Sequence, residues 1–197
     1  MKISLSHISK KYNKQFILKD FSQDFESNTR YAITGSNGKG KSTLLKIASG
    51  FLSPDKGDVT FFENNNVIAP LEVTPHIVFH APYISVNPYL TLKEWFTFYS
   101  TFKKVVDSQE AFFSEIEIDT NKRYNELSSG MQQRFRLYLA FCSDAKIILV
   151  DEPCSFLDKK WKERYQVWLN TKVGEKTMLL SSNDPFEYEG FDNVIQL

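Results

Sequence analysis

The sequence predicts an α/β fold with a central, mainly parallel sheet, an antiparallel β subdomain at the N-terminus and a small helical subdomain. Two short apolar runs, Ile147–Val150 and Met178–Leu180, have the character of strands buried on both faces. Segments with helical spacing alternate with them along the chain. With 197 residues, 42% of them hydrophobic, the chain can bury a sizeable core. We therefore expect a single domain over residues 1–197.

The first part of the chain predicts strands and one helix. Loose alternation of apolar residues over Ile3–Ile8 and Phe21–Phe25 indicates half-buried antiparallel strands. Tyr31–Thr34 is a short apolar strand that runs into a glycine-rich turn. Residues 44–48 then carry helical spacing, and Gly50 is placed to end that helix. The resulting order is a strand, a glycine-rich loop and a helix.

The middle of the chain, about residues 82–142, is expected to be the helical subdomain. A capping box at Thr91 precedes an aromatic helical face, a second helix opens at Asp107, and a third is capped at Ser129. One more helix beyond this subdomain carries its apolar face at Trp161, Tyr165, Trp168 and Leu169.

Charge and composition exclude several classes of protein. The 24 basic residues balance 24 acidic ones without a long block of like charge, so no general nucleic-acid binder is expected. Cys142 and Cys154 lack metal-ligand spacing and are a poor disulfide framework, which indicates a reducing compartment such as the cytosol. We find no signal-peptide pattern and no run near the ~20 apolar residues that cross a bilayer.

The segment Gly35–Ser42 (GSNGKGKS) matches the phosphate-loop pattern G-x-x-x-x-G-K-[ST]. It follows a predicted strand and opens a predicted helix, as that mechanism requires. The glycines let backbone N–H groups turn inward around phosphate oxygens, and the helix N-terminus adds positive potential. We expect Lys41 to reach the outer phosphates and Ser42 to ligate Mg²⁺. The alternative, a glycine turn before an ordinary helix, is disfavoured by this context.

An acidic pair, Asp151 and Glu152, follows the apolar strand at Ile147–Val150. Ligands of open α/β sheets bind at this end of the strands. Asp151 is placed to hold Mg²⁺, and Glu152 to orient or deprotonate an attacking water. Read alone, the pair fits a helix cap or a solvated turn better; its partnership with the phosphate loop favours the catalytic interpretation.

The segment Leu127–Arg134 (LSSGMQQR) resembles the signature segment of ABC-type ATPases, the nucleotide-binding subunits of ABC transporters. Its place just before the acidic pair, with Ser155–Asp158 resembling the family's D-loop, extends the likeness over nearly the whole chain. Physically the signature is a second helix N-terminus that can donate to a phosphate. By itself it would read as an ordinary capped helix.

The resemblance implies a P-loop NTPase of the ABC type that binds ATP and Mg²⁺. The signature of one subunit would cover the nucleotide held by another, so the chain needs a second copy or a related partner, as a homodimer or a heterodimer. Asp158 would lie near that dimer contact, and Tyr12 matches the aromatic residue that stacks on adenine, although it could equally be core or surface. The implied ATP-binding residues are Tyr12, Gly35, Ser36, Asn37, Gly38, Lys39, Gly40, Lys41, Ser42 and Thr43, with Leu127, Ser128, Ser129, Gly130 and Met131 in the signature.

Two positions depart from the family's pattern. His80 stands where the family has the glutamine of its Q-loop, and Asn183 stands where it has the switch histidine. An Asn amide can hydrogen-bond a γ-phosphate, but unlike imidazole it cannot carry a proton near neutral pH. With Glu152, these two complete the expected catalytic set. We expect slow hydrolysis, and we hypothesise that His80 compensates for Asn183; the alternative is a loop histidine that only packs locally.

The function implied by the resemblance is an ATPase that powers a membrane transporter through nucleotide-driven dimerisation. It would sit in the cytoplasm, peripheral on the inner face of the cell membrane, and contact an integral membrane subunit at about His80–Phe102. Two alternatives stay open: a soluble ABC-type ATPase outside transport, and a low-turnover ATP-dependent clamp. A kinase that shares the phosphate loop is disfavoured, because it would not account for the signature segment.

Overall fold

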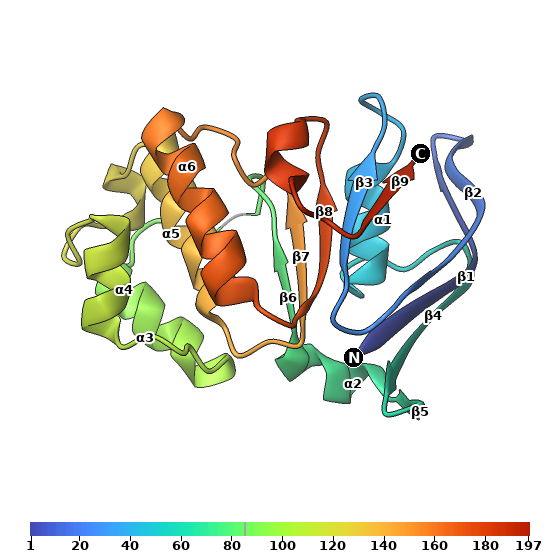
Figure 1. The fold of residues 1–197 in the computed structure, drawn as a ribbon, viewed down its shortest axis with the longest axis horizontal. Coiled ribbons are helices and arrows are strands. Elements are labelled where there is room, and N and C mark those ends of the chain that lie inside the picture. Colours follow the sequence, from blue (N-terminus) through green and yellow to red (C-terminus); the bar gives the residue numbers. More distant parts are fainter. Residues whose placement is uncertain (85) are drawn as a thin grey trace.

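A computed structural model describes residues 1–84 and 86–197 of the chain (Figure 1). The strands are β1 (Lys2–Tyr12), β2 (Gln15–Phe25), β3 (Arg30–Thr34), β4 (Lys56–Glu63), β5 (Asn66–Ile68), β6 (Ile77–His80), β7 (Ile147–Asp151), β8 (Thr177–Ser181) and β9 (Asn193–Gln196). The α-helices are α1 (Lys41–Ala48), α2 (Pro70–Val73), α3 (Leu92–Phe102), α4 (Gln109–Ile116), α5 (Ser129–Cys142) and α6 (Lys159–Trp168). A π-helical turn, Leu169–Val173, continues α6.

The central sheet has the strand order β6-β7-β8-β3-β9, and every pair in it is parallel. All five residues of β7 are buried. Because side chains alternate between the two faces of a strand, Ile147 and Leu149 enter one core cluster while Ile148 and Val150 enter the other. The predicted fully buried strand and the α/β fold class are therefore confirmed, with β7 next to the sheet's edge strand β6.

A second sheet, with the order β2-β1-β4-β5, is antiparallel and lies at the opposite side of the molecule from helices α3 to α6 (Figure 1). Helix α1 lies between the two sheets, and its Leu44, Leu45 and Ile47 share a core cluster with Ile3 from β1 and Leu149 from β7. The antiparallel β start is confirmed, although both first strands are longer than predicted, and β4–β6 and α2 were not predicted.

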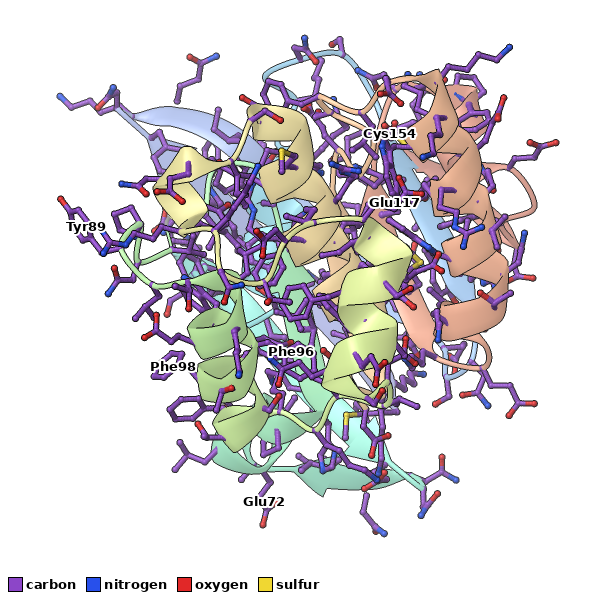
Figure 2. All side chains as sticks on the ribbon, turned by 90° about the vertical axis from the view of Figure 1, so that its left-hand side faces the viewer. Glu72, Tyr89, Phe96, Phe98, Glu117 and Cys154 are labelled. Carbon is purple, nitrogen blue, oxygen red and sulfur yellow. The ribbon has the colours of Figure 1, made fainter. Side chains whose placement is uncertain are left out.

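The helical subdomain, α3 to α5, packs against the face of the central sheet away from α1 (Figure 1). Its interior is aromatic: the ring of Phe112 lies 5.0 Å from Phe96 and 5.1 Å from Tyr138, centroid to centroid. Figure 2 shows Phe96 turned toward α4, whereas Phe98 and Tyr89 point away from the subdomain. Phe98 is half exposed, so the aromatic face of α3 divides between core and surface.

Two helices begin one residue away from the predicted caps. Ser108, rather than Asp107, caps α4 by accepting from the Ala111 amide at 3.2 Å. Ser128, rather than Ser129, caps α5 by accepting from the Met131 amide at 3.3 Å. In each case two neighbouring residues satisfied the same local cap rule. The Thr91 capping box of α3 is confirmed.

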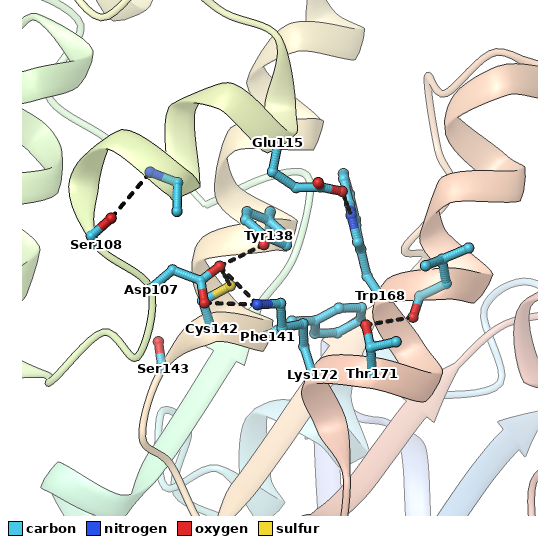
Figure 3. Close-up of polar contacts among 12 residues, drawn as sticks. Asp107, Ser108, Glu115, Tyr138, Phe141, Cys142, Ser143, Trp168, Thr171 and Lys172 are labelled. Carbon is cyan, nitrogen blue, oxygen red and sulfur yellow. Dashed lines mark hydrogen bonds and ion pairs between the residues drawn. The ribbon is translucent and has the colours of Figure 1, made fainter.

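Asp107 instead joins a polar cluster that ties the helices together (Figure 3). Its carboxylate accepts from the Tyr138 hydroxyl at 2.6 Å and from the Lys172 ammonium at 2.7 and 2.9 Å. Nearby, the Trp168 indole donates to Glu115 at 2.6 Å. These contacts connect the loop before α4 and helix α4 with α5, α6 and the π-helical turn.

Candidate functional site

The phosphate loop connects β3 to α1 and depends on glycine at both ends. Gly35 has φ +139° and Gly40 has φ +97°, in the left-handed region that side chains other than glycine disfavour. A Cβ at Gly40 would come within 2.9 Å of Ile17, and one at Gly35 within 2.8 Å of the Leu197 carbonyl. The loop can therefore pass close to β2 and to the chain's end and still turn into α1, where free N–H groups gather.

Lys41 lies across this loop. Its ammonium donates to the Gly35 carbonyl at 2.6 Å and to the Ser36 carbonyl at 3.5 Å, and the residue is only 8% exposed. The Lys39 amide donates to the same Ser36 carbonyl at 3.2 Å, which closes a turn in the loop. A positive charge is thus held above the backbone that the sequence assigns to phosphates.

Asp151 ends β7 beside the phosphate loop and is 2% exposed. Its Oδ2 accepts from the Tyr83 hydroxyl at 3.0 Å, while its Oδ1 has no hydrogen-bond partner among the described residues. A buried carboxylate oxygen without a partner is costly, so such a group is suited to a cation or to that cation's water shell. The residues present, Asp151 with Ser42 nearby in the same cavity, therefore fit Mg²⁺.

Glu152 follows directly and faces the open side of the site. Its backbone N–H donates to the Ser181 carbonyl at 3.0 Å, and its φ of +46° is unusual for a residue with a side chain. The Ser155 hydroxyl donates to its carboxylate at 3.1 Å. Strand β8 and the Ser155 loop thus fix where this carboxylate points.

Two adjoining cavities bring most of the predicted residues together. They have volumes of about 370 and 360 Å³, and both are lined by Ser42 and Glu152. The first is also lined by Tyr12, Ile17, Asn37, Gly38, Gly40, Lys41 and Thr43. The second is also lined by Pro82, Tyr83, Asp151, Ser155 and Phe156. The expected adenine-stacking, phosphate-binding and acidic residues therefore converge, and Tyr12 is on the rim with 47% of its surface exposed.

Asn183 reaches the phosphate loop from the end of β8. Its side-chain oxygen accepts from the Gly35 amide at 3.2 Å, and its nitrogen donates to the Asn37 side chain at 3.4 Å. Asn183 thus contacts two residues of the phosphate loop, and its role toward a terminal phosphate stays a prediction.

His80 is not at this site, which corrects the catalytic position expected for it. The residue is 4% exposed, its Nε2 has no partner in residues 1–84 and 86–197, and it faces α5. Burial, helped by the charge of Arg136, lowers the pKa of His80 to about 3. It lines a separate cavity of about 240 Å³ together with Val78 and Tyr99, so its ring packs between β6 and the helices.

Tyr83, rather than His80, is the residue of this segment that reaches Asp151, and no sequence pattern indicated it. The strand β6 ends at His80, and alternation already buries Val78 and His80 on the side of α5. The residues that follow the strand can turn toward the phosphate loop, as Tyr83 does. Counting from the strand's end, rather than matching the family's residue type, would have drawn attention to Tyr83.

The signature residues line a further cavity of about 200 Å³ rather than the two at the phosphate loop. Ser128, Gly130 and Met131 meet Asp158 there. Gly130 passes so close to the D-loop that an added Cβ would lie 2.8 Å from the Phe156 carbonyl. Leu127 is buried and Ser129 is exposed. Asp158 also caps α6, since its carboxylate accepts from the Trp161 amide at 3.1 Å.

Comparison with known proteins agrees with this geometry. The family model described as ABC transporter matches residues 18–155. The spermidine/putrescine import ATP-binding protein PotA of Acetivibrio thermocellus is 28% identical over 177 residues, which cover 86% of this chain and 50% of the relative. The chain spans about half the length of the curated relatives it matches.

Solved structures share the fold. A putative ABC transporter ATP-binding protein from Pyrococcus furiosus superimposes with a TM-score of 0.81 at 23% identity, covering 100% of this chain and 98% of the other. A dimeric bacterial ABC transporter cassette has a TM-score of 0.79 at 26% identity, with coverage of 99% and 94%. No helix in the described part of the chain is both long and apolar enough to cross a membrane.

Proposed function

This chain belongs to the ABC transporter family, and on that premise we propose that it binds and hydrolyses ATP and powers a membrane transporter through nucleotide-driven dimerisation. One observation carries the proposal: the phosphate loop and the signature each line their own cavity in one chain. Two copies, or this chain and a related partner, are needed to bring one of each together on the same nucleotide. The proposal covers both a homodimer and a heterodimer.

The phosphate loop supplies binding energy. The N–H groups at the start of α1 and the Lys41 ammonium face the cavity in which the triphosphate would lie. Charge-assisted hydrogen bonds of this type are roughly twice as strong as neutral ones. Tyr12, on the rim of the same cavity, is the proposed contact for the adenine ring.

Ser42 and Asp151 would hold Mg²⁺; the supporting observation is Asp151 Oδ1, which has no hydrogen-bond partner in the part of the chain that the structure describes. When bound, this ion neutralises charge that develops on the phosphate oxygens. The chain's own residues do the remaining work. Glu152, held by Ser155, accepts a proton from or orients the attacking water.

Asn183 positions the phosphate loop and can donate to the terminal phosphate, but its amide cannot carry a proton. We therefore expect slow turnover. This residue is also the observation that favours a second candidate function, a clamp that closes on ATP and hardly hydrolyses it. Steady-state phosphate release separates the two: the clamp predicts that the unmodified chain releases phosphate no faster than its Glu152→Gln variant.

The membrane partner is proposed to dock on the helical subdomain side. The 240 Å³ cavity between β6 and the helices is mainly apolar and is lined by Val86, Trp95 and Tyr99. Phe98 and Phe102, on the adjoining helix α3, are 50% and 68% exposed. Exposed aromatic side chains of this density suit a protein interface. This arrangement implies a location at the inner face of the cell membrane; copurification with a multi-span protein in mild detergent would support it.

The test of the proposed function is the oligomeric state of the Glu152→Gln variant, measured by sedimentation or light scattering. The substitution removes the carboxylate that hydrolysis needs, and it removes one negative charge from the site. Saturating Mg-ATP should therefore convert a monomer into a dimer with about one nucleotide per chain. Glu189→Gln, an exposed change after β8, is the matched control. A variant that stays monomeric and takes up no nucleotide would contradict the proposal.

A further inference from the structure

Tyr83 lies between the two groups that would hold the metal. Its hydroxyl donates to Asp151 Oδ2 at 3.0 Å, and it lines the 360 Å³ cavity together with Ser42 and Glu152. A tyrosine hydroxyl has an ordinary pKa of about 10, so at physiological pH Tyr83 meets Asp151 as a neutral hydrogen-bond donor.

The ring of Tyr83 is held from a second side. The ammonium of Lys46, in the last turn of α1, lies 4.2 Å from the centre of the ring. Cation–π contacts of this geometry are attractive. Helix α1, which begins at the phosphate loop, and Asp151 at the end of β7 thus contact the ring and the hydroxyl of the same side chain.

Tyr83 engages Oδ2, one of the two oxygens of the carboxylate that would hold the metal, and it lines the cavity in which that metal would lie. A carboxylate oxygen engaged by a hydroxyl donor is a poorer cation ligand, because the donor must leave or turn before the oxygen can face a cation or its water. The neutral phenol carries no negative charge that could attract the cation in place of the engaged carboxylate oxygen. Tyr83 and the metal are thus competitors for Asp151.

We infer that Tyr83 is a positioning residue that competes with Mg²⁺ for Asp151, so that loading of the metal requires release of the Tyr83–Asp151 hydrogen bond. The inference rests on the proposed function, since it concerns the metal that accompanies ATP.

The experiment measures binding of a fluorescent ATP analogue to Glu152→Gln chains during titration with Mg²⁺. In Tyr83→Phe the ring and its contact with Lys46 are retained, while the competing hydroxyl is lost. We expect half-maximal metal-dependent binding at about five- to tenfold lower Mg²⁺. With EDTA present, affinity for the nucleotide should stay within about twofold.

Two further variants make the test specific. Lys46→Met keeps the hydroxyl and removes the ammonium over the ring, so the Mg²⁺ requirement should fall by about two- to threefold. Tyr89→Phe removes an exposed hydroxyl from the same connecting segment and should change nothing. Thermal unfolding of each variant without nucleotide confirms that the chains are folded.

An unchanged or increased Mg²⁺ requirement in Tyr83→Phe would overturn the inference; an increase would mean that the hydroxyl supports the bound metal's water shell instead. Failure of the proposed function is distinguishable. In that case the parent Glu152→Gln chain takes up no Mg-ATP at any metal concentration, and the inference falls with it.

Discussion

Two aspartates, one in each half of the molecule, show how the chain separates stability from function. Asp107, in the helical half, accepts from Tyr138, Lys172 and Cys142, and its side chain is 12% exposed (Figure 3). Asp151, at the end of the central sheet, is more deeply buried, yet one of its oxygens has no partner among the residues described. A paired buried carboxylate stabilises a fold; an unpaired one is a cost that a ligand can remove.

The surroundings of the two aspartates differ in the same way. Around Asp107 the polar groups are fixed by one another and the space is filled by aromatic rings, such as Tyr138 against Trp168 at 4.7 Å. Around Asp151 lie two cavities that together exceed 700 Å³ and a lysine that binds only backbone carbonyls. We therefore expect changes in the first region to alter unfolding and changes in the second to alter ligand binding.

The largest expected effect is that of Lys41→Ala on nucleotide affinity. The substitution removes the ammonium and with it the charge-assisted contacts to the phosphates. Affinity for Mg-ATP, measured by calorimetry, should therefore fall by about 100-fold. The free energy of unfolding should change by less than about 1 kcal/mol, because the side chain supports only loop carbonyls. Lys93→Ala, an exposed lysine of α3, is the matched control. A large loss of stability would break the comparison.

Asp107→Asn should show the opposite profile. The variant removes the charge that Lys172 neutralises, so the free energy of unfolding in urea should fall by about 2 kcal/mol at pH 7. Affinity for Mg-ATP should stay within about twofold of the parent, since the cluster is apart from the phosphate loop. Loss of nucleotide binding in folded protein would show that the two regions are coupled.

The dependence of the unfolding free energy on pH, measured in acid, gives a second test of the role of Asp107. Burial acts to raise the pKa of Asp107, but the hydrogen bonds from Lys172, Tyr138 and Cys142 together lower it below its ordinary value. A folded-state pKa below the unfolded one gives stability that is complete above about pH 4 and is lost as the pH falls through the folded pKa. The difference in unfolding free energy between the parent and Asp107→Asn should therefore shrink below pH 4.

The sequence predicted the parts of this molecule that local pattern determines. The phosphate loop, its flanking strand and helix, and the buried strand β7 follow from glycine spacing and continuous apolar runs. Strand β4 was not predicted. Phe61 is its one buried residue, so the strand shows little alternation between buried and exposed side chains. The cap at Ser108 was not predicted, because Asp107 meets the same local rule. In the structure Asp107 instead accepts hydrogen bonds from partners more than 30 residues away.

The site was predictable to the same limit. Residues within the loop and after β7 were predicted from their own motifs, and Asn183 from its place in the segment that resembles the family's switch-histidine motif. Tyr83 was not, because its role depends on a contact with Asp151, 68 residues away, which no local pattern encodes. His80 was assigned by its order along the chain, whereas the face of β6 decides that it points to α5.

The smallest expected effect concerns His80 and tests the hypothesis that it compensates for Asn183. The ring packs on α5, and a pKa of about 3 keeps it neutral at pH 7, so it can neither reach nor protonate the phosphates. In His80→Gln, phosphate release per folded chain should change by less than about twofold. Asn183→Ala should lower it more, because that side chain contacts Gly35 and Asn37 directly. Equal losses in the two variants would restore His80 to the catalytic set and show that the helical half takes part in turnover.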